Sequence, residues 1–406
     1  MSNTTRPSTR PGVVFAGADT HADTIHIAVV TEHGQNLADQ EFTTTAAGYA
    51  QAISFITTHG VVQTFGIEGT SSYGAGLTRA ARAAGLDVLE VNRPDRHERR
   101  RKGKSDPLDA YAAARAVAFE RATTPPKDEQ IEGIRALLNV RRSAVKATTA
   151  AINQIRQMLV TAPEPVRAKY SQTEPAALTD ALARARSTHP DPVTAAVLVS
   201  LRTLARRYRA LQAETEQITD QLDRLTAQAN PGLRAAHGTG PVTTAQLLIT
   251  AGANPDRLRT EASFAALCGT APVPASSGKT TGRYRLSRGG DRQANNALHR
   301  IALVRMNSHQ PTKDYVARQH ARGRSKREIL RQLKRAIARE VFRYLTQHIP
   351  VPQIADLRPL RQAKNITLTT AAHHFGIWPA VISTLERGTR RDDNLAETYR
   401  QWLLTA

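Results

Sequence analysis

The chain has 406 residues, enough for two to four domains that each bury a core. Its 56 lysines and arginines outweigh 35 aspartates and glutamates, and the formal net charge of +21 predicts a polyanionic partner, most simply nucleic acid. An anionic membrane surface is the competing partner, but no apolar run approaches the roughly 20 residues of a spanning helix, and no signal peptide is visible. The single cysteine, Cys268, excludes an intrachain disulfide and is typical of a reducing cytoplasm.

Residues 11–125 have the pattern of an α/β domain, which follows a polar tail at residues 1–10 that we expect to be disordered. The alternation of apolar and polar residues, and the change to helical periodicity, predict the elements of this domain. Strands are expected at 13–18, 24–31, 41–44, 63–67 and 88–91, and helices at 46–58, 73–84 and 106–119.

Four carboxylates stand at the ends of these elements. Asp19 follows the first strand and Glu68 follows the fourth, while Asp106 and Asp109 lie three residues apart at the start of a helix, on one face. Acids in a first helical turn also suit the helix dipole, so the helical pair alone is weak evidence for a site. Four convergent carboxylates would repel one another unless cations neutralise them. We therefore predict a site for Mg²⁺, with two ions about 4 Å apart that act on a phosphodiester.

A basic segment precedes the helical acid pair. A solvated charge run is the simplest interpretation, but beside a phosphodiester site contacts to phosphate explain the segment better. The cations predicted to contact nucleic acid are Arg93, Arg96, Arg99, Arg100, Arg101, Lys102 and Lys104.

Residues 126–230 change to helical heptads. Mostly apolar residues alternate spacings of three and four from Ile134 to Leu159, with polar Arg141 and Thr148 in the series, and again from Val197 to Leu225, which predicts a coiled coil. The second helix would be roughly 50 Å long at 1.5 Å per residue. The two helices could pair with each other or with a second protomer.

Residues 231–350 contain a basic, glycine-rich stretch with two adjacent serines, Ser276 and Ser277. A serine nucleophile needs activation, and no histidine partner is evident, so the residues alone favour a flexible basic loop. The cations around the serines that we expect to contact nucleic acid are Lys279, Arg283, Arg285, Arg288 and Arg292.

Residues 351–406 resemble the helix-turn-helix of the Cro and phage-repressor group. The first helix is expected at Thr369–Phe375, and the recognition helix at Trp378–Leu385, after a turn at Gly376. Thr384 and Arg387 would then face the major groove of DNA. A small helical bundle for oligomerisation is the alternative.

Several motifs resemble, in order, one group of transposases. GADTHADT, GIEGT and KSDPLDA look like the DEDD domain of the insertion-sequence family numbered one hundred and ten, which is related to the Piv-type DNA invertases. SSG followed by LSRGGDRQANNAL and a long helix looks like the serine transposase domain of this family, although LSRGG stands where an ISKRG-like string is usual. The resemblance covers about residues 13–349.

This resemblance implies a RuvC-like branch of the RNase H fold for residues 11–125. It also implies a nucleophilic serine in residues 231–350, with Ser277 as the choice and Ser276 its neighbour. Further implications are an active site composed from different protomers of a dimer or tetramer, and a structured bridge RNA that pairs with donor and target DNA.

The sequence thus predicts a DNA transposase or site-specific recombinase that acts on element ends and target DNA, in the bacterial cytoplasm with the nucleoid. A RuvC-like Mg²⁺-dependent endonuclease would need the acids but not the serine. An actin- or hexokinase-like ATPase also begins with an acid-tipped hairpin, although GIEGTSSYGAG matches its phosphate loops only in part. A non-catalytic regulator would use the C-terminal helix-turn-helix alone.

Overall fold

The computed structural model forms two compact units, which are described separately. One unit comprises Met1–Glu132 and Ala251–Arg259, and the other comprises Gly133–Thr250 and Thr260–Ala406. We call them the sheet unit and the helical unit. The structure describes residues 12–91, 105–128, 130–170, 173–186, 188–275, 284–287, 289–351, 353–388 and 392–406.

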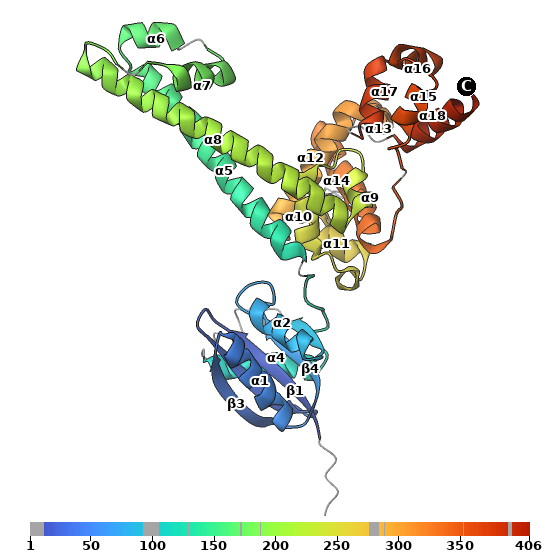
Figure 1. Ribbon diagram of the computed structural model, residues 1–406. Coiled ribbons are helices and arrows are strands. Elements are labelled where there is room, and N and C mark those ends of the chain that lie inside the picture. The colour runs from blue at the N-terminus through green and yellow to red at the C-terminus, as the bar shows by residue number, and fades with distance from the viewer. Residues whose placement is uncertain are drawn as a thin grey trace, which may run out of the picture. The chain divides into compact units, whose positions relative to one another are not determined.

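A five-stranded mixed sheet forms the centre of the sheet unit (Figure 1), with the strand order β3-β2-β1-β4-β5. β1 pairs antiparallel with β2, which pairs antiparallel with β3, whereas β1 and β4, and β4 and β5, are parallel. The strands are β1 Val13–Thr20, β2 Thr24–Thr31, β3 Asn36–Thr43, β4 Val61–Glu68 and β5 Val88–Val91. β3 begins five residues before the predicted strand, because it pairs with β2 along its whole length.

Helices cover both faces of this sheet. α1 (Ala46–Thr58) and α2 (Ala75–Ala83) pack on one face, where their apolar residues form a core with Ala16 and Ala18 of β1. α4 (Asp106–Ala118) packs on the other face, in a core that includes Phe15. Successive residues of a strand point to opposite faces, so the odd-numbered residues of β1 face α4.

Two strand glycines allow α4 to approach the sheet closely. A Cβ atom added to Gly17 of β1 would lie 2.1 Å from the backbone N of Ala114 and 2.3 Å from the backbone O of Ala110. A Cβ atom on Gly66 of β4 would lie 2.8 Å from the backbone O of Ala113. The missing side chains, together with the small alanines of α4, seat the helix backbone directly on β1 and β4.

Two long helices lie side by side in the helical unit (Figure 1): α5 (Gln130–Val160) and α8 (Pro192–Ala229). They run antiparallel, because Ile155 of α5 shares a buried cluster with Leu201 of α8, while Arg141 Nε donates a hydrogen bond to Thr219 Oγ1 at 2.7 Å. The predicted helices therefore pair within one chain.

Two short helices, α6 (Glu164–Tyr170) and α7 (Pro175–Arg184), join the long pair at its far end. The proline-rich sequence of residues 163–165 is typical of a break between helices. In the structure it begins α6, because proline is tolerated in the first turn of a helix.

The rest of the helical unit is also mainly α-helical. α14 carries an exposed basic face, and α15–α18 share a separate apolar core. The elements are α9 Pro231–Ala235, α10 Pro241–Ala251, α11 Glu261–Leu267, β6 Pro272–Pro274, β7 Tyr284–Leu286, α12 Arg292–Ser308, α13 Gln310–Ala321, α14 Lys326–Thr346, α15 Leu357–Ala363, α16 Leu368–His374, α17 Pro379–Glu386 and α18 Asp393–Thr405. The short 3-10 helix η1 (Pro255–Arg257) belongs to the sheet unit. Within the described residues, no helix is both long and apolar enough to cross a membrane.

Candidate metal centre and nucleic-acid interface

The two strand-end acids lie at the same edge of the sheet. β1 and β4 are parallel neighbours in which Ala18 pairs with Ile67, so Asp19 and Glu68 are the next residues along the two strands. Asp19 lies two residues after Gly17, and Glu68 lies two residues after Gly66. Because both glycines face α4 and alternate residues of a strand share a face, both acids lie on the α4 face of the sheet. Thr20 Oγ1 donates a hydrogen bond to the backbone O of Glu68 at 3.0 Å, which ties the two strand ends together.

The helical acid pair is brought to this edge by the start of α4. Ser105, in extended conformation, is the N-cap, and Pro107 lies in the first turn. Pro107 favours a helix start here, because its φ angle is preset and its missing N–H is one that a first turn leaves unbonded. Asp106 and Asp109 consequently occupy the first turn of the helix that packs on β1 and β4.

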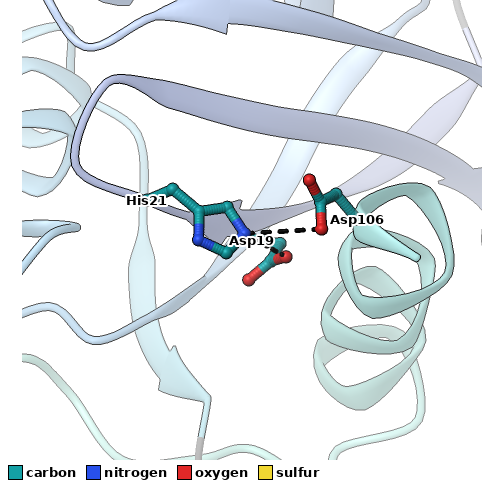
Figure 2. Close-up of side chains that lie close together, drawn as sticks. All are labelled: Asp19, His21 and Asp106. Atoms are coloured by element: carbon teal, nitrogen blue, oxygen red, sulfur yellow. Dashed lines mark hydrogen bonds and ion pairs between the residues drawn. The ribbon is translucent and has the colours of Figure 1, made fainter. Parts of the chain in front are cut away.

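Asp19 and Asp106 meet around a histidine (Figure 2). His21 Nε2 lies 3.2 Å from Asp19 Oδ2 and 3.4 Å from Asp106 Oδ1. One ligand atom from each of the three residues falls within 4.8 Å of the others. Asp19 is buried, while about 40% of the side-chain surface of His21 and of Asp106 is exposed, so the cluster opens to solvent on one side.

Glu68 and Asp109 are half-buried at the same edge. Neither belongs to the three-residue cluster among the described residues. The structure thus brings Asp19 and Asp106 together around His21, and places Glu68 at the end of the neighbouring strand β4 and Asp109 in the first turn of α4. His21 was missed in the sequence, where the only signal was a metal-ligating residue type two positions after Asp19.

A polar network fixes α4 on the sheet behind the acids. The Tyr111 hydroxyl donates to Asp39 Oδ1 at 2.9 Å, and His26 Nε2 lies 2.7 Å from Asp39 Oδ2. The hydrogen bond with His26 lowers the pKa of Asp39, and Tyr111 lowers it further against the effect of burial. Burial and then the bond to Asp39 raise the pKa of Tyr111 to about 12. Arg115 adds a bond from its Nε to the backbone O of Gly34 at 3.0 Å.

The structure describes the residues that flank the predicted serine segment, but not its centre. Ser276, Ser277, Lys279, Arg283 and Arg288 lie outside the described residues, as do all the predicted cations from Arg93 to Lys104. The flanking strands β6 and β7 pair antiparallel, with Pro274 opposite Tyr284. Arg285 on β7 and Arg292 at the start of α12 are exposed, as phosphate-binding residues must be.

Side-chain hydrogen bonds connect the residues that flank the serine segment. Asp291 caps α12 by accepting from the backbone N–H groups of Gln293 and Ala294, and it also accepts a bond of 2.6 Å from Thr250 Oγ1. Asn295 Nδ2 donates to the backbone O atoms of Cys268 and Gly269 at 3.0 and 2.9 Å.

Asn295 also accepts a bond of 2.9 Å from the ammonium of Lys334, whose pKa burial lowers. Asp291 and Asn295 both belong to the string LSRGGDRQANNAL, which the sequence singled out without showing what its polar residues do.

The C-terminal helices α16 and α17 lie within one residue of the two helices expected there, with the turn at Gly376, whose φ is +62°. Trp378, however, is the N-cap rather than a helical residue, because Pro379 disfavours helical backbone in the residue before it. Arg387 is exposed, and Thr384 is half-buried with its hydroxyl bonded to the backbone O of Ala380 at 2.8 Å.

The carboxylate of α17 is turned inward. Glu386 Oε1 accepts bonds from Arg361 Nε at 2.7 Å and from the Tyr399 hydroxyl at 2.8 Å, and only 3% of its side chain is exposed. The exposed face of α17 therefore carries no described acid, and at its start stands Trp378, 81% exposed.

An α/β domain with acids at adjacent strand ends, joined to a helical unit with exposed basic residues, is typical of enzymes that act on nucleic acid. Comparison with known proteins gives the family. Residues 16–162 match the DEDD model described as "Transposase", and residues 230–317 match the model described as "Transposase IS116/IS110/IS902 family". The chain belongs to this family of transposases.

A curated relative is also similar. The chain is 31% identical over 145 residues to the "Insertion element IS110 uncharacterized 43.6 kDa protein" of Streptomyces coelicolor. The alignment covers 36% of this chain and 34% of that protein, so the chain matches about a third of the length of the relative.

Proposed function

We propose that this protein is a DNA transposase that breaks and rejoins phosphodiester bonds at the ends of an insertion sequence, in a reaction that depends on divalent metal. The observation that carries the proposal is the convergence of Asp19 and Asp106 at one sheet edge, within the segment that matches the DEDD family model. Membership of this family implies DNA binding and suggests divalent metal.

The fold assignment that fits this function is the RuvC-like branch of the RNase H fold. The supporting feature is an antiparallel three-strand start, β3-β2-β1, extended by the parallel strands β4 and β5, with a helix crossing the face that carries the acids. In this proposal Asp19, Glu68, Asp106 and Asp109 hold two Mg²⁺ ions. Carboxylate oxygens suit this hard ion, and its chemistry there is to polarise a phosphoryl oxygen and stabilise developing charge.

Ser277 is the proposed nucleophile, with Ser276 as its neighbour. As the serine Oγ–phosphorus bond forms, the bond from phosphorus to a sugar oxygen breaks, and that oxygen leaves as a hydroxyl after gaining a proton. The phosphoserine link conserves the bond energy for rejoining. Support comes from the match of residues 230–317 to the family model and from the exposed cations Arg285 and Arg292 beside the segment.

The partners follow from the same family resemblance. We propose a dimer or tetramer in which the acids and the serine of one active site come from different protomers, with the antiparallel α5–α8 pair acting as a coiled coil in assembly. A structured bridge RNA would pair with donor and target DNA. The net charge of +21 supports a polyanionic partner of this kind.

The C-terminal helices α15–α18 are proposed to bind double-stranded DNA as a helix-turn-helix. α17 would enter the major groove, where Arg387 and Thr384 face the base edges or the backbone. The supporting feature is the inward-turned Glu386, because an outward carboxylate at that position would repel phosphate.

The test is strand exchange on duplexes that carry the element ends, with and without the RNA transcribed from the flanking segment. We expect Asp106→Asn to abolish both cleavage and joining. Ser277→Ala together with Ser276→Ala should abolish the covalent protein–DNA adduct.

Nicking at wild-type rate by the double serine variant would instead establish the metal-dependent endonuclease. Exchange that is unchanged without the transcript would contradict the role of RNA. A non-catalytic regulator would keep its DNA binding and phenotype when all four acids are replaced by amides.

A further inference from the structure

We propose that His21 is a ligand of the catalytic metal ion, so that the site is a mixed nitrogen–oxygen shell that binds Mn²⁺ more tightly than Mg²⁺. This inference rests on the proposed metal site and adds to it a residue outside the four acids. It concerns the cluster of Asp19, His21 and Asp106 drawn in Figure 2.

The separations of the His21 nitrogen from the two carboxylate oxygens are close to those of neighbouring ligands on one octahedral ion, and all three ligand atoms lie within 4.8 Å of one another. Neighbouring ligand atoms at about 2.1 Å from an octahedral ion are separated by about 3.0 Å. His21 Nε2 lies 3.2 Å from the Asp19 oxygen and 3.4 Å from the Asp106 oxygen. Both separations exceed the octahedral edge by no more than about 0.4 Å, so the donors close around an ion with only a small contraction.

The backbone holds His21 ready for this role. The residue begins the turn between β1 and β2, and its backbone N–H donates to the backbone O of Thr24 at 3.0 Å. Asp19 is fixed in β1, and the start of α4 fixes Asp106. Three donors from the end of β1, the turn after it and the start of α4 are therefore positioned by elements that pack on one another, which lowers the cost of organising a shell.

An ion pair without metal is the simpler interpretation of the contacts. His21 and Asp106 are each about 40% exposed, and exposed pairs of this kind stabilise a fold by no more than about 1 kcal/mol. Such a pair also needs only one carboxylate. Here a single nitrogen contacts carboxylate oxygens from two different elements, β1 and α4, which is an arrangement that a shared cation can use.

The consequence for metal choice follows from ligand chemistry. Imidazole nitrogen is a softer donor than carboxylate oxygen, and affinity for sites with such donors rises from Mn²⁺ through the later divalent metals. Mg²⁺ prefers oxygen and keeps its water ligands. A shell with His21 should therefore discriminate between Mn²⁺ and Mg²⁺, whereas a shell of acids alone should discriminate less.

The experiment measures Mn²⁺ bound to the full chain, alone and with a duplex oligonucleotide, by electron paramagnetic resonance at fixed pH. Pulsed measurements detect nitrogen coupled to the bound ion. We expect nitrogen coupling in the wild-type protein, and loss of that coupling in His21→Gln. Mn²⁺ affinity should fall at least the roughly tenfold that loss of even an outer-shell partner costs.

His33→Gln is the matched control, because His33 lies in the same unit with 79% of its side chain exposed. It should keep the coupling and the affinity. Bound Mn²⁺ without nitrogen coupling, or with coupling that survives in His21→Gln, would overturn the role of His21.

The proposed carboxylate site is tested separately by Asp19→Asn. If Mn²⁺ binds without nitrogen coupling and Asp19→Asn abolishes that binding, only the inference about His21 fails. If Mn²⁺ does not bind the wild-type chain, with or without the duplex, the metal site fails as well.

Discussion

In the sheet unit, the candidate metal-binding acids are placed by backbone packing, whereas around the predicted serine segment the chain is held by side-chain hydrogen bonds. Gly17 and Gly66 seat the backbone of α4 on β1 and β4, and this contact carries Asp106 to Asp19. Beside the serine segment, the chain is connected by side-chain hydrogen bonds of Asp291, Asn295 and Lys334. A backbone contact has no room to adjust, while hydrogen-bonded groups can rearrange or be replaced by water, so the two regions should respond differently to substitution.

The largest effect is expected at the acids themselves. Asp19→Asn should lower strand exchange about a thousandfold, because loss of a metal ligand removes about 4 kcal/mol of transition-state stabilisation. Single-turnover cleavage of an element-end duplex measures this loss. Asp23→Asn, exposed in the same β1–β2 turn, is the control and should cleave normally. Equal activity of the two variants would remove Asp19 from the site.

Gly17→Ala should have the next largest effect, this time on the fold. The added Cβ would lie 2.1 Å from the Ala114 backbone, so α4 must move, at a cost of about 3 kcal/mol or more. Hydrogen exchange of β1 and α4 peptides should rise accordingly.

Gly133→Ala is the control, because its Cβ would meet nothing within 4 Å, and in helix α5 it should stabilise by about 1 kcal/mol. If Gly17→Ala exchanged like the wild type, the backbone contact would not position the acids.

Asn295→Ala should have a smaller and local effect. It leaves the backbone O atoms of Cys268 and Gly269 without their donor and Lys334 without its acceptor, at a cost of about 1–3 kcal/mol. Hydrogen exchange should increase in residues 260–300 and not in the sheet unit. Gln293→Ala, exposed in the same turn of α12, should change nothing. If Asn295→Ala raised hydrogen exchange as much as Gly17→Ala does, the two regions would not differ in their response to substitution.

Tyr111→Phe should have the smallest effect, about 1 kcal/mol, because its partner Asp39 is partly exposed. The raised pKa of Tyr111, about 12, means that its stabilisation is complete below pH 10 and is lost as the pH rises through 12. The lowered pKa of Asp39 has the opposite sign: its stabilisation is present above about pH 4 and is lost as the pH falls through the lowered value.

Urea unfolding at several pH values tests both of these pH dependences of stability. In Tyr111→Phe the loss of stability above pH 10 should be smaller, and the acid sensitivity that comes from Asp39 should weaken. Tyr73→Phe, whose ring is exposed, is the control. If Tyr111→Phe lost as much stability above pH 10 as the wild type, the Tyr111–Asp39 hydrogen bond would not contribute to the pH dependence of stability.

Sequence patterns located most elements of the sheet unit. The expected β2, α1 and β5 coincide with the observed Thr24–Thr31, Ala46–Thr58 and Val88–Val91. These elements were predictable because strand alternation and helical periodicity are local properties of a chain. α6 and α7 were not predicted, because short helices with a proline in their first turn look like breaks in the sequence.

The sequence by itself determined the element types, the acids at their ends and the order of motifs that identifies the family. The tertiary structure decided which of these residues meet. His21 reaches Asp106, and Tyr111 reaches Asp39, only because β1 pairs with β2 in one register and α4 lies directly on Gly17. Contacts between residues so far apart in the chain depend on sheet pairing and helix packing, which no local pattern records.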